Sequence, residues 1–223
     1  MVKYLKYATE FAMELVYPEL CMFCGEALDG NRAEKHYLTC CQCLNELPLI
    51  NHKENGCYCL LSYEGQTEEI IKRFKYNNQK RWARSAGVIM AKYADFPEWK
   101  EIDAALPVPL HSKRLRQRGY NQAEVICRAM AAEQDIPVLT GLKRTKETQA
   151  LFGLTVEQRE QAVSGAFAFA EQPGEQVIQG KTLLLVDDIL TTGATLKECA
   201  KVLKECGARE VYCITFAWTK LAE

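Results

Sequence analysis

The feature that most constrains the fold is an alternation of apolar runs with helical periods, which begins near residue 102. Apolar runs at 102–110, 136–142, 165–169, 181–188 and 210–218 predict strands, and the segments 121–133, 145–163 and 194–206 have helical character. Alternation of this kind predicts an α/β fold with a doubly wound, mostly parallel sheet. The chain has 223 residues, which is enough for one such domain and a small appendage.

The predicted strand 181–188 ends in two adjacent carboxylates, Asp187 and Asp188. Ligands of such sheets bind beyond the carboxyl ends of the strands, and the turn from Ile189 to Thr195 leads here into a helix. The N–H groups of a helix N-terminus, together with glycine and hydroxyl side chains, suit a phosphate. Carboxylates beside a phosphate would repel it unless they bind sugar hydroxyls or hold Mg²⁺ through water. The stretch therefore suits a ribose 5-phosphate, and helix capping by the two aspartates is the alternative.

The segment "VDDILTTGAT", residues 186–195, resembles the phosphoribosyl-pyrophosphate (PRPP) signature of type I phosphoribosyltransferases. The resemblance implies a type I phosphoribosyltransferase-like fold in which Asp187 and Asp188 bind the ribose hydroxyls of PRPP, accompanied by Mg²⁺. It also implies that the following loop binds the 5-phosphate. The residues of that loop are Thr191, Thr192, Gly193, Ala194 and Thr195.

A second stretch, "PVPLHSKRLRQRGYNQAE" at residues 107–124, resembles the signature segment of the ComF family of DNA-uptake (competence) proteins. The segment "RTKETQALFGLTVEQR" at 144–159 and a four-cysteine module extend the resemblance over nearly the whole chain. The resemblance implies a role in natural transformation, in which the protein handles incoming single-stranded DNA beside a helicase-like DNA-uptake ATPase. The rival function is an active phosphoribosyltransferase that transfers phosphoribosyl from PRPP to an amine or nucleobase. No segment identifies an acceptor.

Four cations follow the predicted strand 102–110 within six positions. They are Lys113, Arg114, Arg116 and Arg118. In type I folds the loop after the first core strand contacts the pyrophosphate, and the resemblance implies that His111 to Arg118 form this loop. Such a cluster suits a diphosphate or a nucleic-acid backbone, and a solvated basic loop is the alternative.

The cysteines indicate a metal site. Eleven is an odd number, and several of them lie in apolar runs, which argues against a secreted disulfide framework and favours metal ligation in a reducing cytoplasm. The motif C-x₂-C-x₁₅-C-x₂-C is typical of a zinc ribbon with four thiolate ligands, namely Cys21, Cys24, Cys40 and Cys43. Four cysteine ligands close the site, so the predicted Zn²⁺ is structural. We expect residues 1–55 to hold an N-terminal helix and this ribbon, and residues 56–223 to hold the phosphoribosyltransferase-like domain.

Residues 71–84, "IKRFKYNNQKRWAR", carry six cations and no acid, interleaved with three aromatic residues. Cations that follow a backbone and rings that stack on bases are the usual means of binding single strands. The nucleic-acid candidates are Lys75, Lys80, Arg81 and Trp82. The alternative is a pair of helices, broken near Asn77–Asn78, whose aromatic residues face the core and whose charges face water. Both interpretations stay open.

Residues 1–20 have the pattern of an amphipathic helix, with Tyr4, Tyr7, Phe11 and Leu15 on one face. We expect this face to pack against the protein, and membrane attachment is the alternative. No window approaches the roughly 18 uninterrupted apolar residues of a membrane span, and no signal peptide is recognised. A cytoplasmic protein is therefore expected. Its formal net charge of −1 requires any nucleic-acid contact to come from a local patch.

Overall fold

The computed structural model describes residues 18–28, 32–76, 79–147, 155–170 and 178–220, which form two compact units, Met1–Leu47 and Pro48–Glu223. The predicted helix of residues 1–20 lies almost entirely outside the described residues. Pro48 starts the second unit because β1 (Leu49–Glu54) pairs with β2 (Cys57–Ser62), so the expected boundary at 55 falls in the turn between these strands.

The described part of the N-terminal unit contains two short helices, α2 (Arg32–Tyr37) and α3 (Cys41–Asn45). An antiparallel bridge joins Leu20 to Ala27 and closes the loop that carries the first cysteine pair. The backbone N–H of Met22 donates to the carbonyl of Leu38 at 2.8 Å, and both side chains are buried. These contacts bring the two cysteine-bearing segments together.

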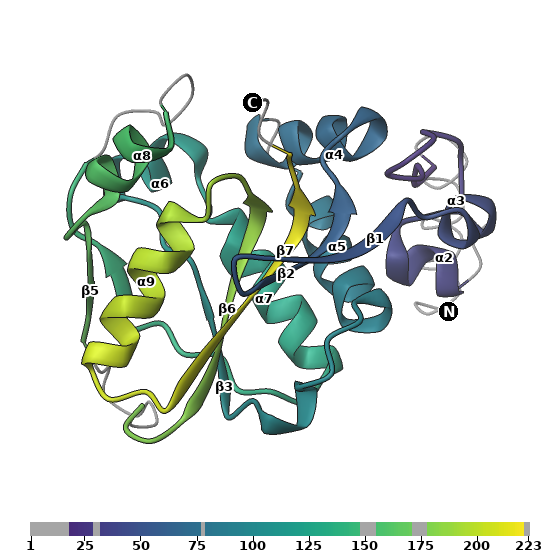
Figure 1. The fold of residues 1–223 in the computed structure, drawn as a ribbon. Coiled ribbons are helices and arrows are strands. Elements are labelled where there is room, and N and C mark those ends of the chain that lie inside the picture. The colour runs from purple at the N-terminus through teal and green to yellow at the C-terminus, as the bar shows by residue number, and fades with distance from the viewer. Residues whose placement is uncertain (1–17, 29–31, 77–78, 148–154, 171–177, 221–223) are drawn as a thin grey trace, which may run out of the picture. The chain divides into compact units, whose positions relative to one another are not determined.

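The second unit is built on a five-stranded sheet with the order β1-β2-β7-β6-β3 (Figure 1). The strands β2, β7 (Glu210–Trp218), β6 (Thr182–Leu190) and β3 (Ala104–Pro107) are parallel, and β1 is antiparallel to β2 at one edge. This topology confirms the predicted mostly parallel sheet. Because parallel strands are covered on both faces, they read as continuous apolar runs, as 183–186 does.

Helices cover the sheet on both sides (Figure 1). The α9 helix (Ala194–Glu205) packs on one face, where its Leu196 and Leu203 share a core with Leu185 of β6. The helices α5 (Lys80–Tyr93) and α7 (Gln122–Glu133) pack against each other and against the sheet. The α4 helix (Gly65–Tyr76) precedes α5, and the break predicted near Asn77–Asn78 lies outside the described residues. Among the described residues, no helix has the length and the apolar composition that crossing a bilayer requires.

The predicted strand 136–142 is wrong. Within it, Val138 makes only an isolated bridge to Ala105 of β3. Pro137 lacks an N–H and Gly141 lacks a side chain, and both weaken a strand. The chain instead forms β4 (Leu142–Arg144), which pairs antiparallel with β5 (Phe167–Phe169) in a separate two-stranded sheet, while α8 (Val156–Val163) occupies the polar segment between them.

The close packing of α5 on α7 depends on Gly87. A Cβ at this position would lie 2.3 Å from the carbonyl oxygen of Ile126 and 2.9 Å from Cβ of Ala129. We expect Gly87→Ala to lower the free energy of unfolding by about 1–3 kcal/mol, because overpacking outweighs the better helix propensity of alanine. Urea denaturation measures this change, and Arg84→Ala at an exposed position of α5 is the control. A stabilised Gly87→Ala variant would show that the helices can separate without cost.

Candidate functional site

The two aspartates lie inside β6, because the strand continues past them. Asp187 pairs in register with Thr215 of β7, and Leu190 still pairs with Trp218. The prediction that the strand ends at Asp188 is therefore wrong by two residues. Successive side chains of a strand point to opposite faces, so the two carboxylates have different neighbours.

Asp187 is half-buried beside the core that α9 covers. Burial raises the pKa of its carboxyl to about 8, and the charge of Asp188 adds to the rise. The backbone N–H of Asp188 donates to Asp187 Oδ1 at 2.8 Å and opposes it. A cation or a sugar hydroxyl beside Asp187 would favour its ionised form.

Asp188 is 3% exposed and faces α4. Its Oδ2 lies 2.9 Å from Nζ of Lys75, in an ion pair without hydrogen-bond geometry. Tyr63 and Tyr120 lie close enough to Asp188 for its charge to contribute to their raised pKa values, after burial as the main cause. Burial raises the pKa of Tyr120 to about 12, with Arg118 lowering it and Asp188 raising it. Tyr63 has no signal in the sequence, whereas Tyr120 lies in the segment 107–124 on which the ComF resemblance rests. Only tertiary packing brings the two tyrosines to this carboxylate.

The loop after β6, residues 191–193, is called the threonine loop below. Gly193 has a φ of 77° and precedes the first residue of α9, so a residue without Cβ fits this left-handed turn. The hydroxyl of Thr192 accepts a hydrogen bond from the N–H of Ala194 at 3.4 Å. The loop thus presents hydroxyl groups at the N-terminus of a twelve-residue helix, where the helix dipole favours a bound anion.

A cavity of about 580 Å³ opens beside the threonine loop. At its rim, Lys197 of α9 forms an ion pair with Glu160 of α8 at 3.0 Å. Most of its other walls are apolar, with Val156, Leu196 and Val211 among them. Its volume falls in the range of small-molecule sites, so a ligand bound at the loop has room beside α9.

The expected basic loop is a helix, α6 (Ser112–Arg118), which ends at Gly119 in the left-handed conformation. The prediction of a loop at 111–118 is therefore wrong. On a helix, Lys113 and Arg116 share one face and Arg114 and Arg118 share another. Lys113 forms an ion pair with Glu147 at 2.7 Å, and the side chain of Arg118 donates to Gln122.

Arg144 is a cation near this site that the motifs did not single out. It is half-buried at the end of β4, with its guanidinium 5.4 Å from the ring centroid of Phe167. Burial lowers its pKa, the charge of Arg114 lowers it further, and Asp187 opposes this. Its position at the start of the segment 144–159, quoted above for the ComF resemblance, was the available signal.

The basic, aromatic stretch is the predicted pair of helices. Phe74 is fully buried and Trp82 is 9% exposed, with the guanidinium of Arg73 lying 5.1 Å from the Trp82 ring. Lys80 and Arg81 are exposed. The rings of Phe74 and Trp82 therefore face the core and most of the charges face water, as the alternative interpretation expected. Lys75 is the exception, because it reaches Asp188.

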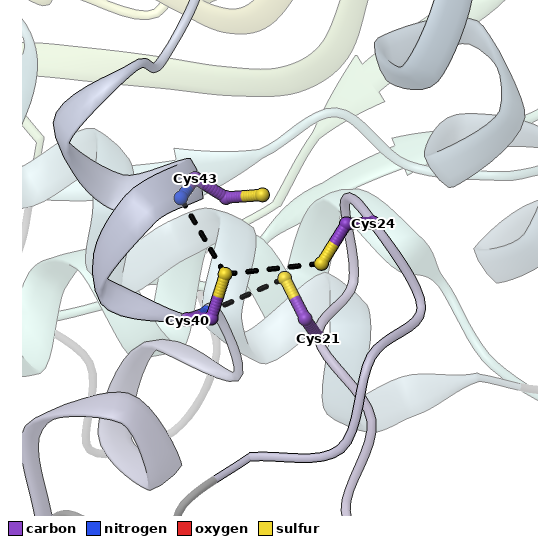
Figure 2. Close-up of side chains that lie close together, drawn as sticks. All are labelled: Cys21, Cys24, Cys40 and Cys43. Atoms are coloured by element: carbon purple, nitrogen blue, oxygen red, sulfur yellow. Dashed lines mark hydrogen bonds between the residues drawn. The ribbon is translucent and has the colours of Figure 1, made fainter.

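The four motif cysteines converge in the N-terminal unit (Figure 2). Their Sγ atoms all lie within 4.8 Å of one another, and Cys24 Sγ lies 3.8 Å from Cys40 Sγ. Four thiolates at about 2.3 Å from a tetrahedral Zn²⁺ would be roughly 3.8 Å apart, so the donor set fits this ion. Cys41 follows Cys40 directly in the sequence but lies outside this group. His36 also lies outside it.

Backbone N–H groups support the cluster. The N–H of Cys40 donates to Cys21 Sγ at 3.3 Å, and the N–H of Cys43 donates to Cys40 Sγ at 3.5 Å (Figure 2). Burial raises the pKa of the Cys21 thiol, but the N–H groups of Cys40 and Cys24 overcome this and leave it below its ordinary value. Burial raises the pKa of Cys43, and the thiols of Cys40 and Cys24 raise it further. These shifts apply without a metal, and binding requires the thiolates. The geometry is compatible with a structural zinc site.

Comparisons with known proteins match most of the chain. The family model described as "Phosphoribosyl transferase domain" matches residues 121–222. Competence protein F of Haemophilus influenzae is 30% identical over 200 residues, which are 85% of this chain and 81% of that protein. DNA utilization protein YhgH of Escherichia coli K12 is 30% identical over 118 residues, which are 50% of this chain and 48% of that protein. Among solved structures, glutamine PRPP amidotransferase from B. subtilis is 19% identical with a TM-score of 0.42, covering 64% of this chain and 30% of that one.

The family model covers β6, the threonine loop and α9, and the likeness to Competence protein F extends over most of both chains. The C-terminal unit is thus a type I phosphoribosyltransferase-like domain. The chain belongs to the ComF family of competence proteins.

Proposed function

We propose that this protein handles incoming single-stranded DNA in natural transformation and that its C-terminal unit binds PRPP or another ribose 5-phosphate. The observation that carries the proposal is the likeness to a competence protein over 85% of the chain. The name of a further relative, "DNA utilization protein", supports it. Within this proposal the protein works in the cytoplasm beside a helicase-like DNA-uptake ATPase.

The threonine loop and the acidic pair support the ligand part of the proposal. N–H groups at the start of α9, with the hydroxyls of Thr191, Thr192 and Thr195, would hold the 5-phosphate. Asp187 and Asp188 would accept hydrogen bonds from the ribose hydroxyls. Mg²⁺ would enter with PRPP and neutralise its diphosphate. In this site the chain's own groups orient the sugar and compensate its charges.

The cations of α5 support the DNA part. Lys80 and Arg81 are exposed in the first turn of the helix, and Nζ of Lys80 lies 5.3 Å from the ring centroid of Tyr120. Trp82 offers little ring surface to a base, because it is 9% exposed. We therefore expect contacts with the backbone of the strand to dominate, and these contacts weaken steeply with salt.

The test is a salt titration of binding to a mixed-sequence single strand. We expect Lys80→Ala with Arg81→Ala to flatten the plot of log affinity against log salt by about 0.7 unit for each lost phosphate contact. Lys143→Ala with Lys201→Ala removes the same charge from exposed positions elsewhere and should leave the slope unchanged. Equal slopes for both double variants would remove α5 from the DNA surface.

The same samples decide between the proposal and an active phosphoribosyltransferase. PRPP, Mg²⁺ and a panel of bases, ammonia and glutamine are added, and pyrophosphate release is followed. The proposal expects salt-sensitive DNA binding with little or no turnover. Turnover that one acceptor stimulates, with no measurable binding to single strands, would replace it with the enzyme.

A further inference from the structure

Lys75 differs from the other cations of its segment in where its charge lies. Its side chain is 20% exposed, and Nζ lies 2.9 Å from Oδ2 of Asp188, whose side chain is 4% exposed. Lys72, one turn earlier on α4, is 53% exposed and pairs with Glu68 at 2.6 Å on the surface. The basic stretch therefore divides, and Lys75 belongs to the acidic pair.

Two contacts hold the end of α4 in place. Phe74, the residue before Lys75, is fully buried in the core. The hydroxyl of Tyr120 donates to the carbonyl oxygen of Phe74, which leaves the backbone beside Lys75 little freedom. A lysine near the C-terminus of a helix is also favoured by the helix dipole. The backbone beside Lys75 is thus held by Phe74 and Tyr120, while the amine of Lys75 reaches Asp188.

The carboxylate of Asp188, which pairs with Lys75, has an unused hydrogen-bond acceptor position. Asp188 Oδ2 is buried, and apart from the ion pair no donor of the described residues makes a hydrogen bond to it. A buried carboxylate oxygen can accept two hydrogen bonds, and leaving one unmade costs free energy. An ion pair with this geometry fixes the carboxylate and leaves Oδ2 with an unused acceptor position.

We propose that Lys75 is a positioning residue of the ribose site, which acts through Asp188, and that it is not part of the DNA-binding surface. The inference rests on the proposed function, since it requires a ribose 5-phosphate ligand at Asp188. Lys75 holds the carboxylate in place, so that a sugar hydroxyl can donate a hydrogen bond to it. The cations that remain for DNA are the exposed ones, with Lys80 and Arg81 among them.

The experiment measures affinity for PRPP with Mg²⁺, and for ribose 5-phosphate alone, by calorimetry. We expect Lys75→Met to lower both affinities about ten- to a hundredfold, because a charge-assisted contact to the carboxylate is lost. Lys75→Arg should recover most of the loss, since it keeps the charge. Lys72→Ala, on the same helix, should change neither affinity. Because Lys75→Met leaves a buried carboxylate without its partner, Lys75→Gln replaces it if circular dichroism shows that the Met variant is unfolded.

Single-strand binding is measured on the same proteins. Lys75→Met should leave the salt slope at the wild-type value, whereas Lys80→Ala should flatten it. The inference is overturned if Lys75→Met binds both ligands like wild type, if arginine recovers nothing, or if the slope falls as it does for Lys80→Ala. Loss of affinity for PRPP alone, with ribose 5-phosphate unaffected, would also overturn it, because Lys75 would then contact the diphosphate. Failure of wild type to bind either ligand would instead refute the ligand part of the proposed function, and this inference with it.

Discussion

Replacing Cys21 and Cys40 together with serine is expected to remove the metal from the N-terminal unit and to unfold it. Binding of a structural zinc ion contributes about 10–16 kcal/mol at neutral pH in small zinc-dependent domains, and most of this is folding free energy. The described part of this unit has only two short helices and a few buried side chains beside the cysteines. Few contacts remain to hold the two cysteine-bearing segments together when the metal is lost.

Elemental analysis of the purified protein measures the effect. Wild type should contain close to one zinc ion per chain, and the double variant almost none, with rapid proteolysis in the region 18–47. The single variant Cys24→Ser should lose metal and become less soluble. Cys41→Ser is the matched control, because Cys41 is exposed beside a cluster member and lies outside the cluster. Full metal occupancy in the double variant would rule out the assignment of these ligands.

Asp187→Asn with Asp188→Asn is expected to abolish Mg²⁺-dependent binding of PRPP while the sheet stays folded. Asparagine keeps the shape of each side chain but removes the charge and one strong acceptor for ribose hydroxyls. Removing the charge of Asp187 should be tolerated, because burial already disfavours its ionised form. Lys75 is partly exposed, so its amine can reach water when Asp188 is neutral.

Calorimetry with PRPP and Mg²⁺ gives the affinity, and thermal unfolding checks the fold. Asp95→Asn, at an exposed position, is the control and should bind like wild type. An affinity unchanged in the double variant would return the segment 186–195 to the alternative of an ordinary capped turn. An unfolded double variant would show that the pair has a structural role that its neighbours do not reveal.

The sequence predicts most of the parallel sheet because buried strands leave an apolar run that no other element explains, as 183–186 does. It also predicts the cysteine cluster, since the four ligands lie in two short knuckles of defined spacing. Contacts between segments that are distant in the sequence could not be predicted from the sequence. The strand β6 continues to Leu190 because β7 pairs with it there, and Lys75 turns inward because α4 packs where Asp188 is buried. A basic loop and a basic helix can have the same amino-acid composition. The pattern of residues 112–118 alone therefore did not show which of the two structures forms.

The placement of Asp187 and Asp188 within a strand makes the length of β6 as constrained as its composition. Removing one residue between Leu183 and Val186 would exchange the surroundings of the two acids, because each strand position faces the side opposite to the next. Asp187 would then face the side of the sheet where Lys75 lies, and Asp188 would take the position beside the core under α9 and lose its cation. Segments that tolerate insertion must therefore lie elsewhere, and any remodelling of this site has to proceed by substitution along β6.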